Sequence, residues 1–237
     1  MNSSNTDSTI DKKDLDFATV LASSVHDMKN SIGMLLASVE NMIDDFPDHD
    51  SQQAKHFSTL HYEASRINGE LVQLLALYKM ENQLLSLRLD EHYVVDLLED
   101  QIARNSRLCH TSGIELVLDC DDVLRWYFDI DLLGGVVHNI LVNCARYTHS
   151  KIKVSAAIDN DLLRIAIEDD GVGYPDNMLL DPASMSREAK LSKGKTHLGL
   201  FFAQEIASLH RQKNRHGYIR LSNNGSLAGG CFELFLP

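Results

Sequence analysis

The feature that most constrains the fold is a seven-residue repeat of apolar positions in the first third of the chain. The repeat runs through two segments: Leu21, Val25, Met28, Ile32, Leu35, Val39 and Met42, and then Leu60, Ala64, Ile67, Leu71, Leu74 and Tyr78. Steps of four and three residues place such side chains along one face of a helix. A proline and several turn-forming residues lie between the segments, in DDFPDHDS (Asp44 to Ser51). We therefore expect two antiparallel helices joined there.

A hairpin with one apolar stripe on each helix leaves one side of its seam uncovered. A second copy of the chain would close that seam in a four-helix bundle, so we expect a homodimer. The alternative is that residues 91–237 cover the hairpin within one chain. We assign the hairpin to residues 16–88. Residues 1–15 are mostly polar, and we expect them to form a flexible tail.

Beyond about residue 90 the apolar pattern changes. Alternating runs typical of strands appear in IELVLDC, KIKVSAAI, LLRIAIED, GYIRLS and CFELFLP. Helical patterns occur near Tyr93 to Arg107, Leu132 to Tyr147 and Leu198 to Leu209. This order predicts an α+β domain over residues 91–237, with the helices on one face of a sheet.

The composition excludes several classes of protein. The chain has 22 Lys and Arg against 34 Asp and Glu, a net charge of −12, which opposes binding to nucleic acid. No apolar run approaches the roughly 20 residues of a membrane helix, and the N-terminus lacks a signal sequence. Its cysteines, Cys109, Cys120, Cys144 and Cys231, form no CxxC pair, which argues against a metal knuckle or a disulfide framework. We expect a cytoplasmic protein without membrane insertion.

The first candidate site is HDMKN, residues 26–30. On the expected helix His26 falls beside the apolar stripe, and Asn30 lies one turn further along the same face. A neutral imidazole is a competent nucleophile, and the carboxylate of Asp27 can accept its proton. The alternative is that His26 is an ordinary half-exposed histidine among the eleven in the chain.

The second candidate site is NILVNCARYT, residues 139–148. Asn139, Asn143 and Arg146 share one face of the expected helix. Two amide oxygens and a cation at this spacing suit a hydrated divalent metal and the phosphates that it bridges. Tyr147 could offer its ring to a base. The amides could instead cap the helix or form a buried network.

Two glycine-bearing loops complete the candidates. In EDDGVGYP, Asp169 ends a strand and is followed by Gly171 and Gly173. The carboxylate of Asp169, a hydrogen-bond acceptor, would therefore lie beside a glycine backbone that a planar ligand can approach closely. In KGKTHLGL, residues 193–200, a loop enters a helix whose first amides favour an anion. Taken alone, the two loops could be an ordinary turn and an ordinary helix start. The stretch between them, Asp176 to Ser192, has the length of a lid.

These four motifs, in this order, resemble the boxes of the sensor histidine kinases of two-component systems. HDMKN resembles their phosphoacceptor box, and residues 139–148 resemble their N box. Asp169-x-Gly171-x-Gly173 resembles the first glycine box, and THLGL (Thr196 to Leu200) resembles the second. The resemblance implies an α+β fold with two parts. A HisKA-like hairpin would form a dimeric four-helix bundle, and a GHKL-type α/β sandwich would bind ATP.

The resemblance also implies an activity. His26 would take the γ-phosphoryl group of ATP, with Asp27 as general base, and pass it to an aspartate of a response-regulator receiver domain. Asn30 would position the water that dephosphorylates the regulator. The fourteen or so residues before the hairpin are too few for a ligand-binding domain. The input is therefore expected from a partner such as an upstream sensor protein, from the surroundings of the dimer, or from a part of the protein outside this chain.

The resemblance implies that ATP and Mg²⁺ are the cofactors. Asn143 would hold Mg²⁺, and Asn139 and Arg146 would serve the metal and the phosphates. Tyr147 would line the base pocket, and Asp169 would accept a hydrogen bond from the adenine amino group. The glycine boxes would supply the rest of the ATP site: Gly171, Gly173, Lys195, Thr196, Leu198, Gly199 and Leu200.

The chain departs from the family pattern at three places. HDMKNS lacks the usual proline, and Arg146 stands where lysine is usual. Lys195 and His197 stand where the second glycine box normally has glycine, although Lys195 could contact phosphate. Two alternatives therefore stay open. One is a phosphotransfer relay protein with a degenerate ATP-binding domain, and the other is an adaptor that inhibits a kinase by forming mixed dimers.

Overall fold

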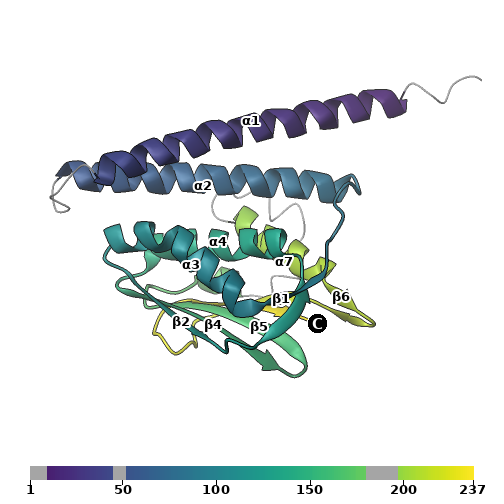
Figure 1. The fold of residues 1–237 in the computed structure, drawn as a ribbon. Coiled ribbons are helices and arrows are strands. Elements are labelled where there is room, and N and C mark those ends of the chain that lie inside the picture. Colours follow the sequence, from purple (N-terminus) through teal and green to yellow (C-terminus); the bar gives the residue numbers. More distant parts are fainter. Residues whose placement is uncertain (1–9, 45–51, 180–196) are drawn as a thin grey trace, which may run out of the picture.

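The computed structural model of the protein describes residues 10–44, 52–179 and 197–237. Two long helices, α1 (Ile10–Asp44) and α2 (Gln52–Glu81), run antiparallel and side by side (Figure 1). The connection predicted over Asp44 to Ser51 lies almost entirely outside the described residues, as does most of the stretch predicted to be a lid.

Helix α1 begins earlier than the sequence predicted. Residues 10–15 belong to the helix, although we expected them in the flexible tail, and residues 1–9 lie outside the described part of the chain. Extending an existing helix costs much less than nucleating one. Lys12, Lys13 and Leu15 are good helix formers, so the helix continues through this polar segment.

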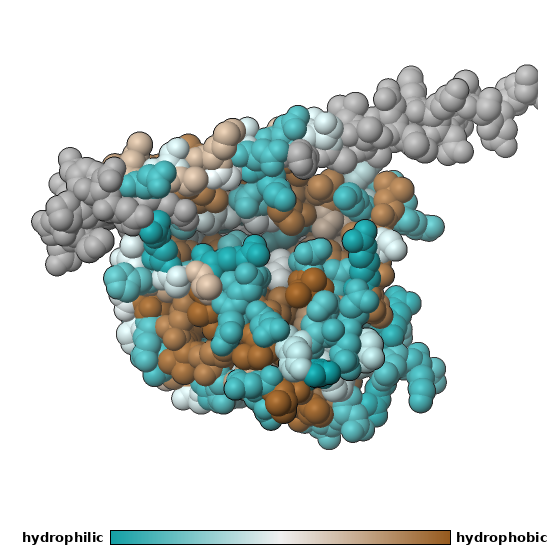
Figure 2. Space-filling view, viewed as in Figure 1, coloured by the Kyte–Doolittle hydropathy of each residue, from teal (hydrophilic) through white to brown (hydrophobic). Residues whose placement is uncertain are grey.

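Each helix of the hairpin buries one row of the apolar stripe and exposes another. The buried rows contain Val25 and Val39 on α1 and Ala64 on α2. Apolar side chains interrupt the hydrophilic surface along the hairpin (Figure 2). The exposed rows keep the seven-residue spacing: Met28, Leu35 and Met42 on α1, and Leu60, Ile67 and Leu74 on α2.

A mixed five-stranded sheet in the order β2-β4-β5-β9-β8 forms the base of the second domain. Its strands are β2 (Glu115–Cys120), β4 (Lys151–Asp159), β5 (Leu162–Asp169), β8 (Tyr218–Ser222) and β9 (Cys231–Leu236). β2 and β4 are parallel, and the other neighbours are antiparallel. Two small antiparallel pairs that we did not predict join β1 (Asp90–Tyr93) to β3 (Arg125–Phe128), and β6 (Arg211–Gln212) to β7 (Arg215–His216).

Helices cover one face of this sheet, as predicted (Figure 1). They are α3 (Val94–Thr111), α4 (Ile130–Tyr147) and α7 (His197–Leu209), and the short α5 (Asp176–Leu179) follows β5. Helix α2 packs against α4 and α7, and Ala76 of α2 belongs to the same buried core. One face of α2 is therefore covered within the chain. No helix in the described ranges has the length and apolar character needed to cross a bilayer.

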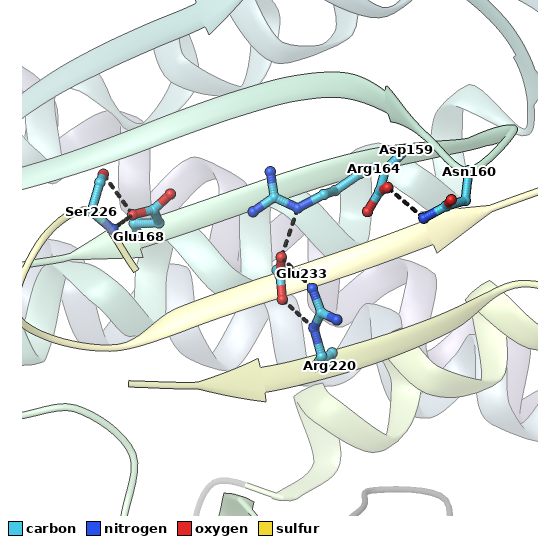
Figure 3. A network of polar contacts seen from close by, with 7 residues as sticks. All are labelled: Asp159, Asn160, Arg164, Glu168, Arg220, Ser226 and Glu233. Atoms are coloured by element: carbon cyan, nitrogen blue, oxygen red, sulfur yellow. Dashed lines mark hydrogen bonds and ion pairs between the residues drawn. The ribbon is translucent and has the colours of Figure 1, made fainter. Parts of the chain in front are cut away.

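The face of the sheet away from the helices holds an ion-pair network (Figure 3). Glu233 on β9 is 4% exposed. It accepts hydrogen bonds from Arg164 of β5 at 2.6 Å and from Nη2 of Arg220 of β8 at 2.9 Å. Burial raises the pKa of Glu233, but the hydrogen bonds from both arginines outweigh burial and lower it. The network therefore ties three adjacent strands together.

Candidate functional site

A cavity of about 230 Å³ lies between α4, the loop that follows β5 and the start of α7. Much of its wall is apolar, with Ile140, Val172, Met178 and Leu200 among the lining residues. A largely apolar cavity with few polar groups is typical of a site for a planar small molecule.

Asp169, the last residue of β5, is the oriented acceptor in this cavity. It is 7% exposed. Its Oδ1 accepts hydrogen bonds from the backbone N–H of Gly171 at 2.8 Å and of Gly230 at 3.2 Å. Its Oδ2 lies 3.9 Å from Sγ of Cys144. Burial and the carboxylate of Asp169 raise the pKa of the Cys144 thiol, so this thiol is a weak donor rather than a thiolate.

The glycines of the first glycine box are required by close packing. A Cβ on Gly171 would lie 2.1 Å from the carbonyl oxygen of Tyr147. Gly173 has a φ of +74°, which favours glycine. Beside it, Tyr174 donates its backbone N–H to Oδ1 of Asn223 at 2.8 Å and accepts from Nδ2 of Asn223 at 2.9 Å. The loop after β5 is therefore held against the loop after β8.

The two asparagines of α4 occupy different places. Asn143 lines the larger cavity and also a smaller one of about 60 Å³, whereas Asn139 lines only the smaller. A Cβ on Gly199 would lie 2.2 Å from Nδ2 of Asn139. This buried nitrogen has no hydrogen-bond partner among the described residues. Helix α2 supplies the opposite wall of the smaller cavity: Ser65, Arg66, Gly69, Glu70 and Gln73.

Arg146 contacts the hairpin. Its charge acts on Tyr62 of α2 and favours the ionised form of that hydroxyl, and its guanidinium carbon lies 5.6 Å from the centre of the Tyr147 ring. Burial raises the pKa of Tyr62, and Arg146 opposes this shift. The ring of Tyr147 is 46% exposed and lines the larger cavity.

The second glycine box is described only in part. Leu198 and Gly199, in the first turn of α7, line the smaller cavity, and Leu200 lines the larger one. Lys195 and Thr196 lie outside the described residues.

None of the described residues that line the two cavities belongs to the histidine motif. His26 is on α1, and Asp27 and Asn30 of the same helix are exposed. Helix α2 lies between α1 and α4 (Figure 1). The structure thus groups Asn143, Tyr147, Asp169, Gly173 and Leu200 around one cavity and leaves HDMKN on a separate element.

Sequence reasoning missed Gly229 and Gly230. The backbone N–H of Gly229 donates to the carbonyl oxygen of Asp169 at 3.0 Å, and Gly230 lines the larger cavity. A Cβ on Gly229 would lie 2.5 Å from that carbonyl oxygen. Two adjacent glycines directly before a buried strand were the signal that could have found them.

Comparison with known proteins identifies the class to which this domain belongs. Residues 128–237 match the family described as "Histidine kinase-, DNA gyrase B-, and HSP90-like ATPase". The matched residues contain α4, β5 and the larger cavity. They form a GHKL ATPase domain of the sensor histidine kinase type.

Several similar proteins are histidine kinases. Histidine kinase P4 of Formosa agariphila is 25% identical over 228 residues, which cover 90% of this chain and 16% of that protein. Sensor histidine kinase CpxA of Escherichia coli K12 is 26% identical over 194 residues, covering 79% of this chain and 40% of CpxA. The chain thus spans 16% to 40% of the length of these relatives.

Solved structures share the fold. Acinetobacter baumannii histidine kinase AdeS matches 87% of this chain and 95% of its own, with a TM-score of 0.56 and 22% identity. The catalytic domain of histidine kinase ThkA matches 63% of this chain and 95% of its own, with a TM-score of 0.53 and 18% identity.

Proposed function

We propose that this chain is a histidine kinase that phosphorylates His26 with ATP and Mg²⁺ and transfers the phosphoryl group to an aspartate of a response-regulator receiver domain. The observation that carries the proposal is the orientation of Asp169 at the larger cavity. Two backbone amides hold one carboxylate oxygen, and the other lies beside the Cys144 thiol. An oriented acceptor in a largely apolar cavity suits the amino group of adenine.

The residues around both cavities fit a nucleotide with its metal. Asn143 borders both cavities, and its side-chain oxygen would hold Mg²⁺. Asn139, with its unpartnered buried amide nitrogen, and Arg146 would contact the metal and the phosphates. Bound MgATP supplies the phosphoryl group and neutralises charge during its transfer. Lys195 and Thr196 would complete the phosphate end.

The histidine motif would carry out the transfer. A ring nitrogen of His26 would attack the γ-phosphorus while the bond from that phosphorus to the bridging oxygen breaks and ADP leaves, and Asp27 would accept the proton from the imidazole. Asn30, which is exposed one turn further along α1, would orient the water that dephosphorylates the regulator.

A second copy of the chain would complete the hairpin. Helix α2 lies between α1 and α4 (Figure 1), and α4 lines both cavities. His26 would therefore meet a nucleotide bound by another copy, or by its own domain after that domain moves on the hairpin. Both helices keep an exposed apolar row with seven-residue spacing. Two such hairpins can bury these rows against each other in a four-helix bundle.

The test is incubation with γ-labelled ATP and Mg²⁺. We expect acid-labile, base-stable label on the wild type and none on His26→Ala or Asn143→Ala. His56→Ala, which changes another histidine on the hairpin that is exposed, is the matched control and should keep the label. Label retained by His26→Ala would contradict the assignment of the nucleophile.

A relay protein is the second candidate. Its His26 would receive a phosphoryl group from one receiver domain and pass it to another, without ATP. The sequence favours this alternative at Lys195 and His197, because side chains there would occupy space that glycine normally leaves beside the triphosphate. A wild type that binds no ATP analogue, yet is phosphorylated on His26 by a phosphorylated receiver, would establish the relay.

A further inference from the structure

The carboxylate of Asp170 binds the loop that follows α4. Its Oδ1 accepts hydrogen bonds from the backbone N–H of His149 at 3.0 Å, of Ser150 at 3.0 Å and of Lys151 at 3.2 Å. Its Oδ2 accepts from the hydroxyl of Ser150 at 2.6 Å. Hydrogen bonds from the hydroxyl and the amide of Ser150 hold the pKa of Asp170 well below its usual range.

This residue joins the two walls of the larger cavity. Helix α4, which ends at Tyr147, supplies one wall with Cys144 and Tyr147, and Asp169 belongs to the other. Asp170 is the direct neighbour of Asp169, and the loop that it binds begins directly after α4. The backbone carbonyl of Asp170 also lies 2.6 Å from Nδ1 of His149.

Two other contacts link α4 to this part of the chain, and both are weaker. The thiol of Cys144 approaches Asp169 only to 3.9 Å, which is a long contact for a poor donor. Gly171 packs on the carbonyl of Tyr147, and a packing contact of this kind limits how closely the walls approach but does not stop them from separating. Hydrogen bonds to a charged carboxylate are the stronger restraint.

We propose that Asp170 is a positioning residue that sets the width of the base cavity and thereby the preference for adenine over other bases. The identity of the ligand rests on the proposed function, whereas the effect of Asp170 on the cavity does not. If the loop after α4 moves away, the distance between Asp169 and a base stacked near Tyr147 increases. A hydrogen bond weakens steeply with such a change.

The first experiment needs no nucleotide. Cys144 lines the cavity and is 5% exposed, whereas Cys109 and Cys231 are 1% and 2% exposed. Alkylation by a small maleimide, followed at each cysteine by peptide mass mapping, should be about tenfold faster at Cys144 in Asp170→Ala than in the wild type. The rates at Cys109 and Cys231 should not change. Equal acceleration at all three, or no acceleration at Cys144, would overturn the proposal.

The matched control is Asp121→Ala. Oδ1 of Asp121 accepts from the backbone N–H of Val123 at 3.0 Å in an exposed turn, and Asp121 is not among the residues that line the cavity. Asp121→Ala therefore removes a hydrogen bond to a carboxylate in a turn, as Asp170→Ala does, but it leaves the walls of the cavity unchanged. The Cys144 rate in Asp121→Ala should equal that of the wild type.

The second experiment compares equilibrium binding of ATP and GTP. We expect Asp170→Ala to weaken ATP binding about tenfold with little change for GTP, so that the preference for ATP shrinks. Asp170→Asn keeps one acceptor oxygen and should recover most of this loss. An unchanged preference in Asp170→Ala would overturn the proposal. A wild type that binds neither nucleotide would instead refute the proposed function, and the alkylation rates would then decide the role of Asp170.

Discussion

An added Cβ would meet its nearest atom at a shorter distance at Gly171 than at Gly173 or Gly230. At Gly171 it would lie 2.1 Å from the carbonyl oxygen of Tyr147 and 2.9 Å from Oδ1 of Asp169. We expect Gly171→Ala to lower the free energy of unfolding by about 3 kcal/mol, as overpacking does, and to weaken nucleotide binding. Urea denaturation and equilibrium binding would measure the two effects.

The control for this substitution is Gly33→Ala on α1, where an added Cβ meets nothing within 4 Å. Alanine has the higher helix propensity, so this variant should gain up to about 1 kcal/mol. If Gly171→Ala were as stable as the wild type, the close packing on Tyr147 would be disproved.

His210, directly after α7, is a buried neutral histidine. Its Nε2 accepts a hydrogen bond from the backbone N–H of Asp129 at 3.2 Å, so Nδ1 donates to the carbonyl oxygen of Ile206, 2.8 Å away. Burial lowers the pKa of His210. Protonation of Nε2 would add a second donor facing the N–H of Asp129.

The lowered pKa of His210 predicts a pH dependence of stability. An unfolded histidine titrates near pH 6.5, so the unfolded chain binds protons before the folded one does as the pH falls. The free energy of unfolding should therefore decrease as the pH is lowered from about 7.5 to 5.5. His210→Gln should reduce this decrease. Burial also lowers the pKa of His138, so His138 should account for part of the decrease that remains in His210→Gln. The free energy of unfolding would be measured by urea denaturation at several pH values. The same dependence on pH in His210→Gln as in the wild type would contradict the prediction.

At the scale of elements, α2 has partners on both sides. It packs against α1 in the hairpin and against α4 and α7 in the ATPase domain. The sequence predicted the first contact and kept the second only as the alternative in which residues 91–237 cover the hairpin, because the buried residues of α2 include polar ones. His61, Ser65 and Gln73 are 6%, 7% and 3% exposed, and a hydropathy pattern assigns such residues to the solvent.

The electrostatic interaction of Arg146 with the hydroxyl of Tyr62 leads to a prediction about α2. If Arg146 serves the phosphates, α2 and the nucleotide compete for its guanidinium. We expect Tyr62→Phe to tighten the binding of a fluorescent ATP analogue about threefold, the value of one modest hydrogen bond. Tyr78→Phe, on the same helix, should leave the affinity unchanged. Equal affinity in Tyr62→Phe and the wild type would show that the contact does not compete with the nucleotide.

The elements of the ATPase domain were predictable to different extents. The five strands of the main sheet and its covering helices follow from clear apolar periods. β1, with the sequence DEHY, is short and mostly exposed, so only its pairing with β3 makes it a strand. Gly230 joins the site across 61 residues from Asp169, because β9 pairs with β5. A local motif search does not detect that pairing.

At the scale of the whole molecule, the open rows of the hairpin predict the oligomeric state. We expect the wild type to be a dimer by sedimentation equilibrium. Leu35→Glu and Leu60→Glu, which change residues that are each 54% exposed, should raise the dissociation constant of the dimer at least about tenfold, because a charge would be buried in the bundle. Val123→Glu, at an apolar position that is 73% exposed in the ATPase domain, should have no effect. A wild type that is monomeric at high concentration would refute the four-helix bundle.

The position of β9 in the sheet sets an order of events during protein synthesis. β9 lies between β5 and β8, yet the ribosome makes it after both. Until residues 231–236 emerge, the two neighbouring strands keep unpaired edges, and Glu233 is not yet present to bind Arg164 and Arg220. The two helices of the hairpin precede all of these strands in the chain. In the proposed dimer, nascent chains would therefore be able to pair through their hairpins before either has a finished ATPase domain.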